Sequence, residues 1–137
     1  MILNMGKFTV SVAHSLRLVS VSDILSFGII QTRVFIKTVG EPEDLKIVPG
    51  SFIPEDAIKD GFYSKKHNFK LPDVSRNKTV YLENLKKGRY LAFYVDENGN
   101  ERVSGSPDNP LSLSYEIKGG LYSCTLTGLT VDPDAFI

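Results

Sequence analysis

The sequence lacks several features that would assign it to a large functional class. Cys124 is the only cysteine, so no disulfide can form within the chain. There is no tryptophan, which argues against a sugar-binding platform of indole rings. The 16 basic and 16 acidic residues give a formal net charge of zero. The chain therefore lacks the long-range attraction typical of proteins that bind nucleic acids or anionic membranes.

Long apolar runs are also missing. No run approaches the roughly 18 to 20 residues that cross a bilayer, and the first residues lack the apolar stretch and cleavage site of a secretory signal. The length of 137 residues and the hydrophobic content of 42% are typical of one domain with one core. We therefore expect a single β-rich domain over residues 1–137, a cytoplasmic location and no membrane partner.

Catalytic and metal-binding motifs are absent as well. No G-x-S-x-G nucleophile elbow and no phosphate-binding G-x-x-x-x-G-K-[ST] motif occurs. His14 and His67 lie in unrelated segments without a suitably spaced third ligand. Residues 96–101 resemble the start of a calcium loop, but Gly99 stands at the fourth position instead of the sixth, and Pro107 replaces the closing glutamate. We predict no catalytic residue, no cofactor and no metal site.

Two further groups have a structural interpretation. Cys124 lies in an alternating segment without a cluster of histidine or basic residues that would lower the pKa of its thiol. We interpret it as a small core residue. Residues 63–70 combine lysines with aromatic residues, which would suit a nucleic-acid contact. A solvated β arm explains the same residues, and we expect the arm.

The first half of the chain contains strand patterns and an irregular region. Residues 7–12 alternate apolar and polar side chains, and residues 16–21 do so more weakly. Residues 27–37 are the strongest β run there. Their buried face is predicted to hold Ile30, Thr32, Val34 and Ile36.

A loop or arm excursion is predicted over about residues 38–78, because glycine and proline interrupt its first part. Within it, residues 45–48 are a short strand candidate. A short helix is expected near residues 54–60, opened by Pro54 and closed by Gly61. Residues 62–71 are expected to form an exposed strand or flexible arm, and residues 75–78 a loop.

The last third predicts two hairpins. Residues 89–95 and 101–104 flank Asn98-Gly99, a dipeptide that favours a tight hairpin turn. Residues 111–118 and 121–129 flank Gly119-Gly120. The whole pattern predicts a mainly β fold, an antiparallel β-sandwich or small barrel of about seven to nine strands.

The stretch from residue 85 to residue 136 resembles the closing part of small tail-associated structural proteins of phages and prophages. In those proteins a Gly-Ser-x-x-x-Pro-Leu connection precedes a final hairpin, and here Gly105-Ser106 and Pro110-Leu111 stand at the matching places. The resemblance implies a non-enzymatic tail tube, tail terminator or head-to-tail connector that assembles into rings. The implied partners are other copies and neighbouring virion proteins, in a virion assembled in the host cytoplasm. DNA would only pass through the ring lumen.

Rings assembled by β-augmentation need exposed edges and extended arms. The irregular segments and the C-terminus supply the candidates. A monomeric β-sandwich binding module, of adhesin or carbohydrate-binding type, remains the alternative, and it predicts an exposed aromatic platform instead of oligomers. The candidate oligomer contacts are Phe62, Tyr63, Phe69, Leu71, Phe136 and Ile137.

Overall fold

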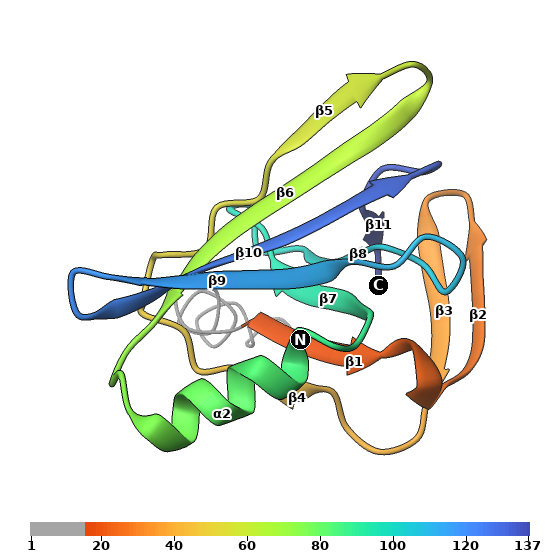
Figure 1. Cartoon of the computed structure of the whole chain (residues 1–137). Helices are drawn as coiled ribbons and strands as arrows, with labels where there is room; N and C mark the ends of the chain where they lie inside the picture. Colours follow the sequence, from red (N-terminus) through yellow and green to blue (C-terminus); the bar gives the residue numbers. More distant parts are fainter. Residues whose placement is uncertain (1–15) are drawn as a thin grey trace.

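The computed structural model describes residues 16–137, and the strand expected at residues 7–12 lies outside them. Two β-sheets pack face to face in these residues, so the prediction of a mainly β, sandwich-like fold is confirmed (Figure 1). Sheet A has seven strands in the order β2-β3-β11-β8-β7-β1-β4, and sheet B has four in the order β5-β6-β10-β9. The strands outnumber the seven to nine predicted, because two-residue strands such as β4 and β11 leave no periodic pattern.

The strands of sheet A are β1 (Leu16–Ser20), β2 (Ile24–Ile30), β3 (Arg33–Thr38), β4 (Glu43–Asp44), β7 (Tyr90–Val95), β8 (Glu101–Ser104) and β11 (Ala135–Phe136). Those of sheet B are β5 (Asp56–Lys59), β6 (Phe62–Leu71), β9 (Ser112–Lys118) and β10 (Leu121–Thr130). A short 3-10 helix, η2 (Val21–Asp23), joins β1 to β2. The helix α2 (Arg76–Leu85) joins β6 to β7.

The predicted helix near residues 54–60 is wrong. The chain there forms β5, which pairs antiparallel with β6. Asp60 and Gly61 form the turn between them, with φ of 53° and 82°. Asp-Gly is a strong hairpin signal because both of its residues tolerate positive φ. This hairpin, with its long partner strand, outweighs the local helix signal of Pro54.

The helix α2 begins where the sequence predicted a loop at residues 75–78. The side chain of Ser75 caps α2 by accepting a hydrogen bond from the Lys78 amide at 3.1 Å. Leu82 is fully buried and anchors the helix to the core. About half of the excursion expected over residues 38–78 is therefore regular structure, including β5, β6 and the start of α2.

The run at residues 27–37 is a hairpin and not one strand. Gln31 and Thr32 form its turn with φ of 52° and 67°, a conformation that neither residue type signals. Val34 is buried as predicted and Ile36 is partly buried, whereas Ile30 is 64% exposed. Across the two-residue turn, Ile30 pairs with Arg33 and not with a residue of the Val34 face. The predicted buried face is therefore wrong for β2.

Both predicted C-terminal hairpins are present. β7 pairs with β8 across the turn that contains Gly99, which has φ of 83°. β9 pairs with β10 in register from Leu121–Lys118 to Thr127–Ser112. β10 also pairs with β6 along its whole length, from Tyr122 to Thr130. The centre of sheet B is thus built from distant segments.

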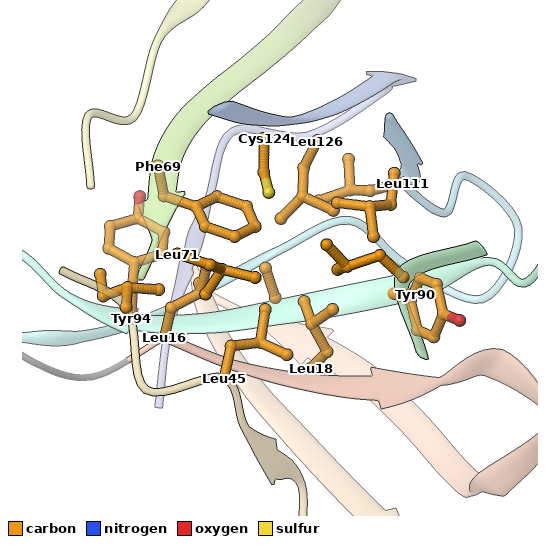
Figure 2. Packing of buried hydrophobic residues seen from close by; sticks show 14 of the residues in the cluster. Leu16, Leu18, Leu45, Phe69, Leu71, Tyr90, Tyr94, Leu111, Cys124 and Leu126 are labelled. Atoms are coloured by element: carbon orange, nitrogen blue, oxygen red, sulfur yellow. The ribbon is translucent and has the colours of Figure 1, made fainter. Parts of the chain in front are cut away.

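The main core lies between the two sheets. Figure 2 shows Phe69 and Cys124 of sheet B pointing toward Leu16, Leu18 and Leu45, which lie on the side of sheet A. Cys124 is 1% exposed, and burial raises the pKa of its thiol to about 12, so the prediction of a core cysteine is confirmed.

A second apolar cluster lies on the opposite face of sheet A. It gathers Val19 of β1, Leu91 and Phe93 of β7, and Val34 of β3. Because β7 contributes to both clusters, five consecutive residues of this strand are buried. β7 is therefore buried on both faces, and its sequence lacks the alternation of a half-buried strand.

Candidate functional site

A polar cluster is buried where the main core ends. Along β6 the inward side chains are Leu71, Phe69, His67 and Lys65, since alternate residues of a strand share one face. All four are at most 2% exposed. The row therefore passes from two apolar residues to a histidine and a lysine without leaving the interior.

The ammonium group of Lys65 joins two carboxylates. Its Nζ lies 2.7 Å from Oδ2 of Asp56 and 2.8 Å from Oδ1 of Asp134. The first contact is also a hydrogen bond, whereas the second does not meet hydrogen-bond geometry at Oδ1 and is an ion pair. Asp134 is 5% exposed, so a charge partner is what makes its burial tolerable.

Tyr94 completes the surroundings of Asp134. Its hydroxyl group donates a hydrogen bond to Oδ2 of that carboxylate. Burial raises the pKa of the Tyr94 hydroxyl, and the negative charge of Asp134 raises it further. Tyr94 therefore acts as a neutral hydrogen-bond donor.

His67 links three segments. Its Nδ1 accepts a hydrogen bond from the Glu55 amide at 3.2 Å, and its Nε2 lies 2.8 Å from Oγ of Ser104. Because Nδ1 accepts, we assign the proton of the neutral ring to Nε2, which then donates to Ser104. Burial lowers the pKa of His67 more than the nearby Asp134 carboxylate raises it, so the ring is neutral at pH 7.

Ser104, His67 and Asp134 match a catalytic triad in composition only. In a working triad the acid holds Nδ1 of the histidine and Nε2 accepts the serine proton. Here Oδ2 of Asp134 lies 3.9 Å from Nε2, the same nitrogen that faces Ser104. Ser104 is also completely buried. The arrangement provides neither a base for the serine nor a path for a substrate.

The same region contains a metal-like group. Asp56, His67 and Asp134 each present a possible ligand atom, and these atoms lie within 4.8 Å of one another. Lys65 already contacts both carboxylates, so its ammonium group supplies the positive charge that a metal ion would bring. The geometry therefore fits an internal ion-pair network better than a metal centre.

An open cleft of about 790 Å³ lies beside the buried cluster. The rings of Phe52 and Tyr94 form one wall, with their centroids 5.0 Å apart. Arg102 donates to Oδ2 of Asp96 at 3.2 Å and to the carbonyl oxygen of Asp134 at 2.7 Å. The lining residues are Gly50, Phe52, Pro54, Asp56, Tyr94, Val95, Asp96, Glu97, Asn98, Arg102 and Asp134.

Asp96 stabilises the turn that borders the cleft. Its Oδ1 accepts hydrogen bonds from the amides of Asn98 and Asn100, at 3.0 and 2.9 Å. Burial by itself would raise the pKa of Asp96, but these hydrogen bonds and Arg102 lower it below its ordinary value. The calcium-like segment is thus a hairpin turn closed by its own first carboxylate.

The predicted oligomer contacts fall into two groups. Phe69 and Leu71 are 1% and 2% exposed in the main core. Their proposed role is wrong, because β6 is half-buried and turns these side chains inward. Phe62, Phe136 and Ile137 are 41%, 37% and 42% exposed, and Tyr63 is half-buried. These four remain available to a partner. Phe62 and Tyr63 belong to sheet B, whereas Phe136 belongs to sheet A and Ile137 follows it.

The buried polar cluster was missed by sequence reasoning. Lys65 and His67 alternate with residues of the opposite face and continue the row of Phe69 and Leu71, and this spacing was the available signal. No signal links Tyr94, Ser104 and Asp134 to them, since the link depends on how β7, β8 and the C-terminal segment pack.

Comparison with protein-family models, with curated proteins and with solved structures finds no match to this chain. Within residues 16–137, no helix has the length and apolar character needed to cross a membrane. The fold and the geometry of the cluster and the cleft are therefore the structural basis for a proposal about function.

Proposed function

We propose that this chain is a non-enzymatic structural protein that self-associates into rings or a tube, as the subunits of a phage or prophage tail or neck do. The observation that carries self-association is the β5–β6 hairpin, which extends past the rest of the molecule (Figure 1). All four residues of β5 are exposed. β5 is also an edge of sheet B, with no partner strand on its outer side among the described residues.

An exposed edge strand is a hazard for a protein that remains monomeric. Its unpaired amide and carbonyl groups invite other strands, and monomers usually protect such edges. Here the hairpin also displays Ile58, which is 75% exposed, and Phe62. Association of copies would cover these apolar groups and would use the free edge as an interface.

The assignment to a tail or neck depends on the resemblance of residues 85–136 to small tail-associated proteins. The absence of catalytic function is supported by the geometry around Ser104, which is buried and faces a protonated nitrogen of His67. In this role the buried ion-pair network of Lys65 would orient the base of the β5–β6 hairpin, since Asp56 begins β5.

The test is the size of the purified protein. We expect light scattering coupled to size-exclusion chromatography to show oligomers that grow with concentration, and negative-stain microscopy to show rings or short tubes. A protein that stays monomeric at every accessible concentration contradicts the proposal. If the protein forms rings but its gene has no capsid, portal or tail genes beside it, self-association stands and only the assignment to a tail is contradicted.

The cleft favours a second candidate, a monomeric binding module. Phe52 and Tyr94 contribute aromatic rings to its wall, and Glu97 would attract a cationic group, whereas Asp56 and Asp96 are already paired with Lys65 and Arg102. This candidate predicts a monomer that binds a ligand, with affinity lost in Phe52→Ala. An unchanged affinity in that variant would remove the cleft from consideration.

A further inference from the structure

The two sheets do not cover each other completely. Side chains of paired residues on neighbouring strands share one face of a sheet. Across sheet A, Leu16 pairs with Tyr94, Tyr94 with Arg102, Arg102 with Phe136, and Phe136 with Arg33. The first two belong to the main core. The inner face of sheet A therefore continues past the core to β11, β3 and β2.

This continuation, which we call the A overhang, is exposed. Ile30 and Phe35 are 64% and 54% exposed, in contrast to buried Val34 on the other face of β3. Two arginines lie over its rings, Arg102 at 4.1 Å from the centroid of Phe136 and Arg33 at 5.9 Å from that of Phe35. The A overhang consists of Ile30, Arg33, Phe35, Lys37 and Phe136.

Sheet B has its own uncovered inner face, which we call the B overhang. On β6 the inner row continues outward from Lys65 to half-buried Tyr63, whose partner on β5 is Ile58. Asp60 is exposed at the turn of the hairpin. Asp56 lies at the inner end, where it already pairs with Lys65. The B overhang consists of Asp56, Ile58, Asp60 and Tyr63.

The two overhangs are complementary in chemistry. Within residues 16–137, each is an inner sheet face that lacks the opposite sheet, and each displays apolar side chains that such a sheet would cover. The A overhang carries the exposed cations Arg33 and Lys37, whereas the B overhang carries the exposed acid Asp60 together with Asp56, which already pairs with Lys65 of its own chain. Opposite charges around apolar centres are the arrangement that orients a specific interface.

We propose that the B overhang of one copy packs on the A overhang of the next copy, so that the sandwich is completed between chains. This inference rests on the proposed self-association and names the surfaces that carry it. Ile58 and Tyr63 of one copy then cover Phe35 and Phe136 of its neighbour, and Asp60 lies near the basic residues. Because the two surfaces differ, the contact is heterologous, which is the type that builds rings and filaments.

The test uses one disabled overhang at a time. Phe35→Asp disables the A overhang and Ile58→Asp the B overhang. Val80→Asp is the matched control, because Val80 on α2 is 51% exposed and belongs to neither overhang. Circular dichroism and urea unfolding check that each variant is folded, and light scattering measures its size.

We expect Phe35→Asp and Ile58→Asp to be monomers under conditions in which the unaltered chain and Val80→Asp form oligomers. An equal mixture of the two monomeric variants should form dimers and nothing larger, since such a mixture retains one intact A overhang and one intact B overhang per pair. An interface of two identical patches predicts no such rescue.

Several results would overturn this inference. Oligomers of unchanged size in either variant would exclude its overhang from the interface, and loss of assembly in Val80→Asp would show that the effect is not local. A mixture that stays monomeric would exclude the pairing of A with B. A monomeric unaltered chain would instead refute self-association itself, so the two failures are distinguishable.

Discussion

The covered and the uncovered parts of the two inner sheet faces both carry apolar side chains, but among the described residues only the covered parts have an opposite sheet packed on them. On β6, Phe69 and Leu71 are buried in the main core, whereas Tyr63 in the same row is only half-buried. On sheet A, Leu16 is fully buried and Phe136 is 37% exposed, although both lie on the same face. Apolar alternation therefore builds the strand, and the presence of an opposite sheet decides whether the apolar row stabilises the monomer.

The polar cluster lies at the boundary between these two parts. Phe69 faces other apolar side chains, and the next inward residues, His67 and Lys65, meet a serine and two carboxylates. An ion pair this deeply buried contributes little net stability, but removing one partner is costly. Substitutions at this boundary therefore lower the free energy of unfolding by leaving a buried charge unpaired. Substitutions in the core lower it by creating cavities.

The largest effect is expected in the covered core. Phe69→Ala removes a 1% exposed ring between the sheets and should lower the free energy of unfolding by about 3 to 5 kcal/mol. Urea unfolding measures it. Phe62→Ala, in the same strand but 41% exposed, is the control and should cost much less. Equal losses in the two variants would contradict the distinction between covered and uncovered parts.

A slightly smaller effect is expected at the boundary. Lys65→Met leaves Asp134 buried without its cation and should cost about 3 kcal/mol, near the lower end for a broken buried pair because Asp56 is partly solvated. Adding Asp134→Asn removes the unpaired charge, so the double variant should be more stable than the single one. Additive losses in this double-mutant cycle would show that the two groups are not coupled.

Acid should weaken the boundary through His67. The pKa of His67 is lowered in the folded protein. Below the unfolded value of 6.5, His67 is therefore protonated in the unfolded chain while it is still neutral in the folded chain. Stability is therefore complete above that pH and falls as the pH decreases toward the folded pKa, by at most about 1.4 kcal/mol per pH unit.

The variant His67→Gln isolates this contribution. Glutamine retains an acceptor for the Glu55 amide and a donor for Ser104, but it does not titrate. Urea unfolding at a series of pH values from about 7 to about 5 should show a steeper loss in the unaltered chain than in the variant. Parallel curves would mean that His67 has the same pKa in both states.

The smallest effect on the monomer is expected in the B overhang. Ile58→Ser alters a side chain that is 75% exposed, so the free energy of unfolding should change by no more than about 0.5 kcal/mol when measured at concentrations that keep the chain monomeric. At high concentration the same variant should lose the extra stability that association provides. A large loss in the monomer would place Ile58 in a core.

Local patterns predicted the last third of the chain well. Asn98-Gly99 and Gly119-Gly120 both mark hairpin turns, because Gly99, Gly119 and Gly120 adopt positive φ, which glycine tolerates without strain. Asp60-Gly61 is a hairpin signal of the same kind, and it outweighs the helix signal of Pro54. The turn at Gln31 and Thr32 carries no such signal, so it was beyond reach from the sequence.

The candidate site could be predicted only in part. Lys65 and His67 share a face with Phe69 by their spacing, which places a lysine and a histidine beside a core residue. The partner Asp134 lies far along the chain and reaches them only because the C-terminal segment returns to sheet A as β11. Both Phe136 and Leu71 are predicted to be accessible, but only Phe136 is exposed. Leu71 is buried because the opposite sheet packs on it, and the sequence does not show where that sheet lies.

The sequence by itself determined the mainly β class and the strands and turns of the last third, because these follow from the local backbone preferences of each residue. Only the tertiary structure decided which apolar rows are covered. Sheet B covers sheet A at β1 and β7 but not at β3, so the same apolar alternation produces a core at Phe69 and an exposed surface at Phe35. Burial is a relation between distant segments, and for that reason the overhangs become visible only when both sheets are assembled.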